Sequence, residues 1–202
     1  MSFHRISVYQ RAALALVALS LSISAMAKSS SSPAIRNIRI DNFGRINDNY
    51  YRGAQPKERD YADLAAMGVK TVIDLTRDGN SAEPSLVRLA GMNFYRIPMT
   101  TSDRPAPAAI AQFLKLVNDP ANQPVYVHCQ GGRHRTGAMT AVYRITQDGW
   151  TADRAYAEMK QFRFEGFPGH PELKSFVYDY YTKFSQAKLA DKQKPAKAAV
   201  SQ

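Results

Sequence analysis

The chain has 202 residues, a single cysteine and a formal net charge of +10. One cysteine excludes an internal disulfide and argues against a cluster of thiolate metal ligands. The positive charge suits an anionic substrate, but at this level it does not by itself indicate nucleic-acid binding.

Residues 1–27 have the composition of a secretory signal peptide. Two arginines precede an apolar run at 12–27, which ends in Ala-Met-Ala, a small-residue cleavage pattern. The run is shorter than the ~20 residues of a spanning helix and is interrupted by serines, so an uncleaved membrane anchor is the weaker interpretation. We therefore expect export to the periplasm or beyond, a Ser-rich spacer over 28–36, and no membrane span after cleavage.

Residues 37–184 are expected to form one α/β domain. Short β-branched and aromatic runs alternate with amphipathic segments, a pattern that predicts a largely parallel central sheet with helices packed on it. The expected strands are two short ones around a turn at Gly44, followed by segments 69–75, 92–99 and 124–128. Helices are expected over 57–68 and 81–91, from about 107, from about 137, and around the apolar stripes at 152–159 and 173–180.

The C-terminal segment 185–202 is expected to be a solvated, disordered tail. Lysine, alanine and glutamine alternate there without an apolar face to bury. The charge of the segment from Lys183 onward is +4, which leaves +4 on the folded body after removal of the signal peptide. A rival interpretation is a surface adhesion or interaction domain that uses this lysine-rich tail.

The segment VYVHCQGGRHRTGAM, residues 125–139, carries the strongest chemical signal. Cys129 follows the last expected strand and precedes a seven-residue turn and a helix that is expected to start near Gly137. Ligands of open α/β sheets bind beyond the carboxyl ends of strands. Gly131 and Gly132 let backbone N–H groups point inward to bind an anion, and the following helix adds its positive end. These features stabilise a phosphate and lower the pKa of a thiol.

Residues on either side of the turn complete the predicted site. Arg135, six residues after Cys129, has a planar guanidinium that can hold two phosphate oxygens. Thr136 offers a hydroxyl that can donate to the thiolate and help it leave in a second step. His128 is expected to lie under the loop and fix its backbone. Together these residues predict nucleophilic catalysis on a phosphate ester.

The loop HCQGGRHRTG resembles the His-Cys-x5-Arg-Thr-Gly loop of cysteine-dependent protein tyrosine and dual-specificity phosphatases. Over about residues 37–184 the chain is similar to the atypical dual-specificity branch known from plants and fungi, which includes inositol pyrophosphate phosphatases. The resemblance implies a sheet of four to five strands flanked by helices, a phosphocysteine intermediate, and neither a metal nor another cofactor. It assigns nucleophilic attack to Cys129 and phosphate binding to Arg135. The loop residues implied to surround the phosphate are Gln130, Gly131, Gly132, Arg133 and His134, and Arg133 stands where inositol phosphatases carry a basic residue.

The general acid is less clearly marked. Tyrosine phosphatases use an aspartate on a separate loop to protonate the leaving oxygen. Asp103, in TTSDRPAP, stands where many dual-specificity enzymes carry this aspartate, but it can equally cap the turn before Pro105. Asp74 and Asp78, which lie in and after an earlier strand, are weaker candidates.

The sequence thus predicts a phosphatase whose substrate is a phosphorylated protein or, alternatively, an inositol polyphosphate, an inositol pyrophosphate or a phosphoinositide. No nucleic-acid partner is expected. A phosphate-binding pseudoenzyme would be expected to have lost Cys129 or Arg135, and both are present. A sulfurtransferase-like enzyme also presents a cysteine at the end of a strand, but it does not need Arg-Thr-Gly at the start of the next helix.

Overall fold

The computed structural model describes residues 38–164 and 170–193. In chain order their elements are β1 (Gly44–Asn47), β2 (Tyr50–Gly53), α1 (Asp60–Ala66), β3 (Thr71–Thr76), α2 (Glu83–Leu89), β4 (Asn93–Met99), α3 (Pro107–Asn118), β5 (Val125–His128), α4 (His134–Gln147), α5 (Ala152–Gln161) and α6 (Pro171–Gln193). The expected signal peptide and spacer lie outside the described residues. None of the helices in the described ranges has the length and hydropathy needed to cross a membrane.

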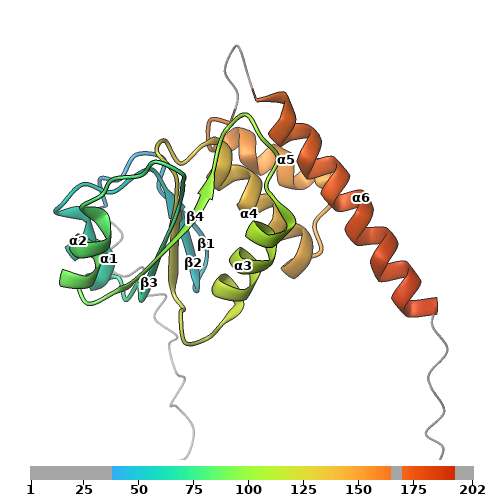
Figure 1. The fold of residues 1–202 in the computed structure, drawn as a ribbon. Helices are drawn as coiled ribbons and strands as arrows, with labels where there is room; N and C mark the ends of the chain where they lie inside the picture. Colours follow the sequence, from blue (N-terminus) through green and yellow to red (C-terminus); the bar gives the residue numbers. More distant parts are fainter. Residues whose placement is uncertain (1–37, 165–169, 194–202) are drawn as a thin grey trace, which may run out of the picture. The chain divides into compact units, whose positions relative to one another are not determined.

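The five strands form one sheet in the order β1-β2-β5-β3-β4 (Figure 1). Only the β1–β2 pair is antiparallel, and the neighbours β2–β5, β5–β3 and β3–β4 run parallel. The predicted α/β fold with a mostly parallel sheet is confirmed. Because β2, β5 and β3 run in the same direction, their carboxyl ends meet at one edge of the sheet, where the chain leaves Gly53, His128 and Thr76.

Helices cover both faces of the sheet, as Figure 1 shows. On one face, α1 and α2 pack against Val72 and Tyr126, and on the other, α3 and α4 pack against Ile73 and Val127. Helices α5 and α6 lie against α4 and build a further apolar cluster there. Since side chains alternate across a strand, His128 shares the face of Tyr126.

The first hairpin turns at residues 48–49 and not at Gly44, where the sequence predicted the turn. Gly44 is instead the first residue of β1. A Cβ at this position would lie 2.4 Å from the ring of Phe162, so the glycine is needed for close packing. The sequence could not reveal this contact, because Phe162 follows α5, more than a hundred residues later.

Helix α6 continues to Gln193, past the predicted domain end at residue 184. The expectation of disorder from residue 185 is therefore corrected for 185–193, while 194–202 lie outside the described residues. The last turns of α6 are exposed and consist mainly of Lys, Ala and Gln, which have high helix propensity. They extend a helix that Leu173 and Val177 have already anchored in the core.

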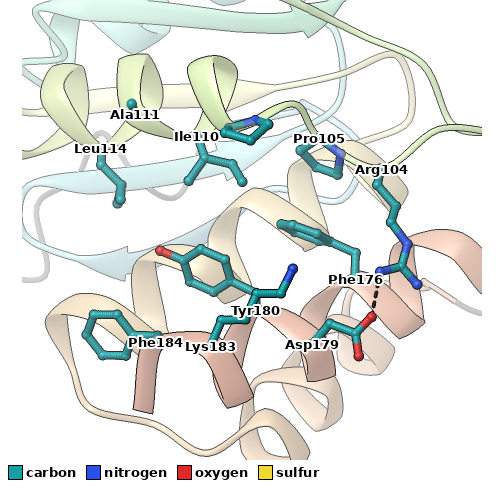
Figure 2. Close-up of a pocket in the computed structure, with 11 residues that line it drawn as sticks. Arg104, Pro105, Ile110, Ala111, Leu114, Phe176, Asp179, Tyr180, Lys183 and Phe184 are labelled. Atoms are coloured by element: carbon teal, nitrogen blue, oxygen red, sulfur yellow. Dashed lines mark hydrogen bonds and ion pairs between the residues drawn. The ribbon is translucent and has the colours of Figure 1, made fainter. Parts of the chain in front are cut away.

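A groove of about 610 Å³ runs between α3 and α6 (Figure 2). Ile110 and Leu114 of α3 form one wall, and Tyr180 and Phe184 of α6 form the other. At one end Arg104 makes ion pairs with Asp179 and, at 3.1 Å, with Glu172, both on α6. These pairs connect α6 to the loop between β4 and α3, the loop that carries Asp103.

Candidate active site

Cys129 lies at the edge of the sheet where the parallel strands end. It follows the last residue of β5, and its side chain is 2% exposed. The alternation along the strand places it on the face of Val127, and it packs in the apolar cluster that includes Met139 of α4. The predicted nucleophile is therefore buried under the segment that leads into α4, at the edge of the sheet where α/β proteins bind ligands.

The turn after Cys129 is shorter than predicted. Helix α4 begins at His134 and not near Gly137, and the Gly137 N–H already donates to the carbonyl of Arg133 at 3.0 Å. Arg135 and Thr136 therefore belong to the first helical turn. The N–H groups of a first turn have no acceptor within the helix, and together they form its positive end. This positive end is directed at the cysteine, because the Thr136 N–H bonds to Cys129.

Gly132 gives the loop its shape. Its φ is +63°, in the left-handed region that favours glycine, and a Cβ there would lie 2.4–2.6 Å from the Gly53–Ala54 peptide. The Gly132 carbonyl accepts a hydrogen bond from Asn42 Nδ2 at 2.8 Å and another from Arg52. Both donors come from the sheet side of the loop, so the carbonyl is held away from the concave side.

The environment of Cys129 favours its thiolate. Burial alone raises the pKa of the thiol. The hydroxyl and N–H of Thr136, together with the charges of Arg135 and His128, outweigh burial and hold the pKa of the thiol below its ordinary value. The Thr136 hydroxyl is buried without a hydrogen-bond partner in the described part of the chain, so its donor is available to the sulfur.

His128 contacts two carboxylates, whereas its place before Cys129 in the sequence predicted that it would fix the loop backbone. Its Nε2 lies 2.9 Å from Glu83 of α2, and its Nδ1 lies 4.0 Å from Asp74 of β3. The sheet register explains the second contact, since Asp74 pairs with His128 across the β3–β5 ladder. Burial lowers the pKa of His128, but Glu83, Asp74 and the Cys129 thiolate together raise it above its ordinary value. The surroundings of His128 thus favour its cationic form directly before the nucleophile.

The two carboxylates make further contacts with Arg96 and Tyr61. Arg96 of β4 donates to Asp74 at 2.7 Å and lies 3.9 Å from Glu83. The Tyr61 hydroxyl donates to Glu83 at 3.0 Å. Asp74, Glu83 and His128 lie close enough to resemble a metal-ligand set, but the Arg96 guanidinium already supplies the positive charge. The cluster therefore fits an ion-pair network under the site.

A polar pocket of about 270 Å³ opens beside the catalytic loop. Its lining consists of Arg135 and Gln130, of Gln55, of Thr76 at the end of β3, and of Asp78, Gly79 and Asn80 in the loop between β3 and α2. Arg135 also donates to the carbonyl of Met99 at 3.3 Å, which ties the catalytic arginine to the end of β4. Its Nε is buried without a partner in the described residues, so the guanidinium retains a donor for a ligand.

The three candidate acids lie in different surroundings. Asp103 is exposed and accepts a hydrogen bond from the Thr100 hydroxyl at 2.6 Å, and its N–H donates back to Thr100. Asp78 is exposed and lines the polar pocket. Asp74 is buried and paired with Arg96, so it cannot reach a leaving group. Asp103 does cap its own turn, and it stands four residues after the Met99 carbonyl that Arg135 contacts.

His134, the first residue of α4, faces away from the ion-pair network. The centroid of its ring lies 3.8 Å from that of His170, with the two rings tilted, and the ring packs edge-on against Phe164. Burial, with the nearby His170, lowers the pKa of His134 to about 4, so it is neutral near pH 7. The Nε of Arg133 is buried without a partner among the described residues.

Comparison with known proteins agrees with this geometry. Residues 39–173 match the family described as DSP-PTPase phosphatase fused to NAD+ kinase. The chain belongs to this family. The match covers the whole sheet, the loop after β5, and helices α4 and α5.

Relatives in this family are named either as inositol diphosphatases or as protein phosphatases. The chain is 27% identical over 130 residues to inositol diphosphatase SIW14 of Saccharomyces cerevisiae, a match that covers 61% of this chain and 46% of the relative. It is 32% identical over 124 residues to the dual specificity protein phosphatase TpbA of Pseudomonas aeruginosa, covering 61% and 55%. The chain thus spans about half the length of these relatives. A structure of a cysteine-to-serine variant of P. aeruginosa TpbA with phosphotyrosine superimposes with a TM-score of 0.62 at 25% identity, covering 74% of this chain and 91% of that one.

Three residues of the site were missed by the sequence analysis. Arg52, Asn42 and Glu83 lie 77, 87 and 46 positions before the cysteine and reach it only through the fold. For Arg52 there was a signal, a charged residue in the otherwise uncharged strand YYRG. For Glu83 there was none, because a glutamate in the first turn of a helix is ordinary.

We expect Glu83→Gln to lower the free energy of unfolding by about 3–5 kcal/mol, since it removes one partner of a buried ion pair. Burial raises the pKa of Glu83, but hydrogen bonds and charge from His128, Gln55 and Tyr61 outweigh burial and hold this pKa below its ordinary value. The contribution of the Glu83 carboxylate to the stability of the fold is therefore present above pH 4.5 and is lost as pH falls through the folded pKa. The pKa of His128 is raised, so the contribution of its protonated ring to the stability of the fold is present below pH 6.5 and is lost as pH rises through the folded pKa.

Urea denaturation at several pH values measures the free energy of unfolding of the unsubstituted protein and of Glu83→Gln. The control is Asp148→Asn, which breaks a more exposed ion pair with Arg144 and should cost about 1 kcal/mol or less. Equal effects of the two substitutions would contradict the network.

Proposed function

We propose that this chain is a cysteine-dependent phosphatase that hydrolyses phosphate monoesters on proteins through a phosphocysteine intermediate. The observation that carries the proposal is the buried Cys129 thiol, whose pKa is lowered at the positive end of α4 with Arg135 beside it. A related protein is named a dual specificity protein phosphatase, and its variant was crystallised with phosphotyrosine. Both support the proposal.

The reaction follows from the positions of these groups. The Cys129 thiolate attacks phosphorus, an S–P bond forms, and the ester P–O bond breaks as the leaving oxygen takes a proton from an acid. Arg135 and the loop N–H groups stabilise the charge on the phosphoryl oxygens. Water then attacks phosphorus, the S–P bond breaks, and inorganic phosphate departs. The Thr136 hydroxyl stabilises the departing thiolate.

The pocket favours a substrate with one phosphate over a highly charged one. Arg135 and Asp78 are the charged residues that line the polar pocket, and their charges oppose each other. An inositol pyrophosphate carries many negative charges and needs several cations around it. Arg133, with its unpartnered Nε, is the further cation on the loop. The inositol diphosphatase among the relatives makes this the second candidate function.

Cys129→Ser is expected to abolish hydrolysis of p-nitrophenyl phosphate while binding of the substrate survives, because the attacking sulfur is lost and the loop is kept. For the unsubstituted protein, kcat/KM should rise with pH through the lowered pKa of Cys129, since only the thiolate attacks. Phosphate release and equilibrium binding measure the two effects. Turnover by the serine variant, or turnover that a chelator removes, would contradict the mechanism.

Asp103→Asn is expected to reduce the rate about 10²–10⁴-fold on an alkyl phosphate, whose oxygen needs a proton to leave, and much less on p-nitrophenyl phosphate. Asp78→Asn, which changes an exposed acid in the pocket lining, is the matched control and should not discriminate between leaving groups. The two substrates are compared by kcat/KM. If Asp103→Asn slows both substrates equally, Asp103 only caps its turn and is not the acid.

Arg133→Ala tests the choice between substrates. Inositol polyphosphates present further phosphates that an additional guanidinium can bind, whereas a phosphotyrosine peptide presents one. We therefore expect a larger loss of kcat/KM on the inositol substrate, measured by phosphate release on both. Arg77→Ala, an exposed arginine outside the pocket lining, is the control. If the unsubstituted protein prefers inositol phosphates over phosphotyrosine peptides, the second candidate function is correct and the protein-phosphatase proposal is wrong.

A further inference from the structure

Arg52 of β2 is a fully buried cation under the catalytic loop. Its side chain is 0% exposed and is among the largest buried side chains of the described residues. One terminal nitrogen donates to the Gly132 carbonyl, and the guanidinium carbon lies 4.0 Å from the centroid of the Phe162 ring. The Nε and the other terminal nitrogen are buried without a hydrogen-bond partner in the part of the chain that the structure describes.

A buried charge of this kind normally has a carboxylate partner. Among the described residues, none forms an ion pair with Arg52. Glu158 of α5 acts on Arg52 electrostatically, but its carboxylate is held by Arg144 at 2.6 Å. The charge of Arg52 is therefore not cancelled locally. The ionisable groups that act on it are Tyr50, Glu158, Cys129 and Tyr126.

The sheet register places Arg52 on the same side as the nucleophile. Arg52 pairs with Val127 across the β2–β5 ladder, and Cys129 lies two residues beyond Val127 on the same face. Cys129 is in turn one of the anionic groups that act on Arg52. The arginine and the nucleophile therefore lie on the same face of the sheet, on or directly after adjacent strands.

We propose that Arg52 is a positioning residue that holds the Gly132 peptide and supplies a buried positive charge to the Cys129 thiolate and to the anion bound above it. The proposal rests on the phosphatase function proposed above and adds a second cation to that site. The groups that then act on the sulfur are Thr136, Arg135, His128 and Arg52.

The positioning effect follows from the peptide geometry. The two ends of a peptide group point in opposite directions, so fixing the Gly132 carbonyl on the sheet side turns the N–H of the following residue toward the concave side. Asn42 fixes the same carbonyl without a charge. Arg52 and Asn42 therefore share the positioning role, and only Arg52 adds the charge. The chain itself thus offers a matched pair of variants.

Arg52→Met keeps most of the buried volume and removes both the charge and the donor. We expect it to raise the apparent pKa of Cys129, read from the pH dependence of alkylation by iodoacetamide, by about one unit, the lower end of the effect of a nearby opposite charge. We expect the affinity for inorganic phosphate, measured by calorimetry, to fall about tenfold. Asn42→Gly keeps the left-handed backbone at position 42 and should weaken phosphate binding while leaving the alkylation profile unchanged.

Arg52→Lys separates charge from geometry and carries the test if the methionine variant does not fold. An ammonium keeps the buried charge but loses the planar fork, so the alkylation profile should stay near that of the unsubstituted protein while phosphate binding weakens. A folded Arg52→Met with unchanged profile and phosphate affinity overturns the proposal, and so does an Arg52→Lys variant whose phosphate affinity is unchanged. Alkylation and phosphate binding are both measured without turnover. If the protein binds phosphate and has a low thiol pKa but hydrolyses no substrate, the proposed phosphatase function is wrong, while the positioning role of Arg52 still stands.

Discussion

A thiolate that is almost fully buried persists only where nearby donors and positive charges replace the water that it has lost. Around Cys129 these are the first turn of α4, Arg135, the imidazolium of His128 and the guanidinium of Arg52. The same requirement disfavours unpaired carboxylates in the buried surroundings of the sulfur. Each buried acid is held by its own cation, Asp74 by Arg96 and Glu83 by His128. The network of ion pairs therefore keeps negative charge away from the nucleophile as much as it stabilises the fold.

The parallel sheet separates these charges with little cost. On adjacent strands, residues in register point to the same face, so Asp74 and His128 lie together on the side of α1 and α2. Arg52 and Cys129 lie on the opposite side, with α3 and α4. His128, which binds the acids, and the nucleophile Cys129 are thus consecutive residues whose side chains point to opposite faces of the sheet. Only His128 connects the two sides, because it directly precedes the cysteine.

The sequence predicted the parts of this arrangement that local patterns specify. The alternation of strands and helices gave the α/β fold, and the glycines and Arg-Thr-Gly after Cys129 marked the loop. The start of α4 was placed too late because Arg133 and His134 carry no capping signal, and the end of the last helix was placed too early because its exposed turns lack an apolar face. The contacts of His128 depend on strand register and on a helix 40 residues away, which no local pattern encodes.

The concentration of cations under one loop also explains why the site suits an anion so well. Arg52, Arg135 and His128 repel one another when no substrate is bound, and in a buried site this repulsion is weakly screened. The Cys129 thiolate relieves part of it, and a bound phosphate, with two further negative charges, relieves more. The repulsion among the cations destabilises the folded protein without a ligand, and binding of the anion is more favourable because it removes this repulsion. Since charge on the phosphoryl oxygens and on sulfur is what the transition state redistributes, the same preorganised charges favour binding and reaction alike.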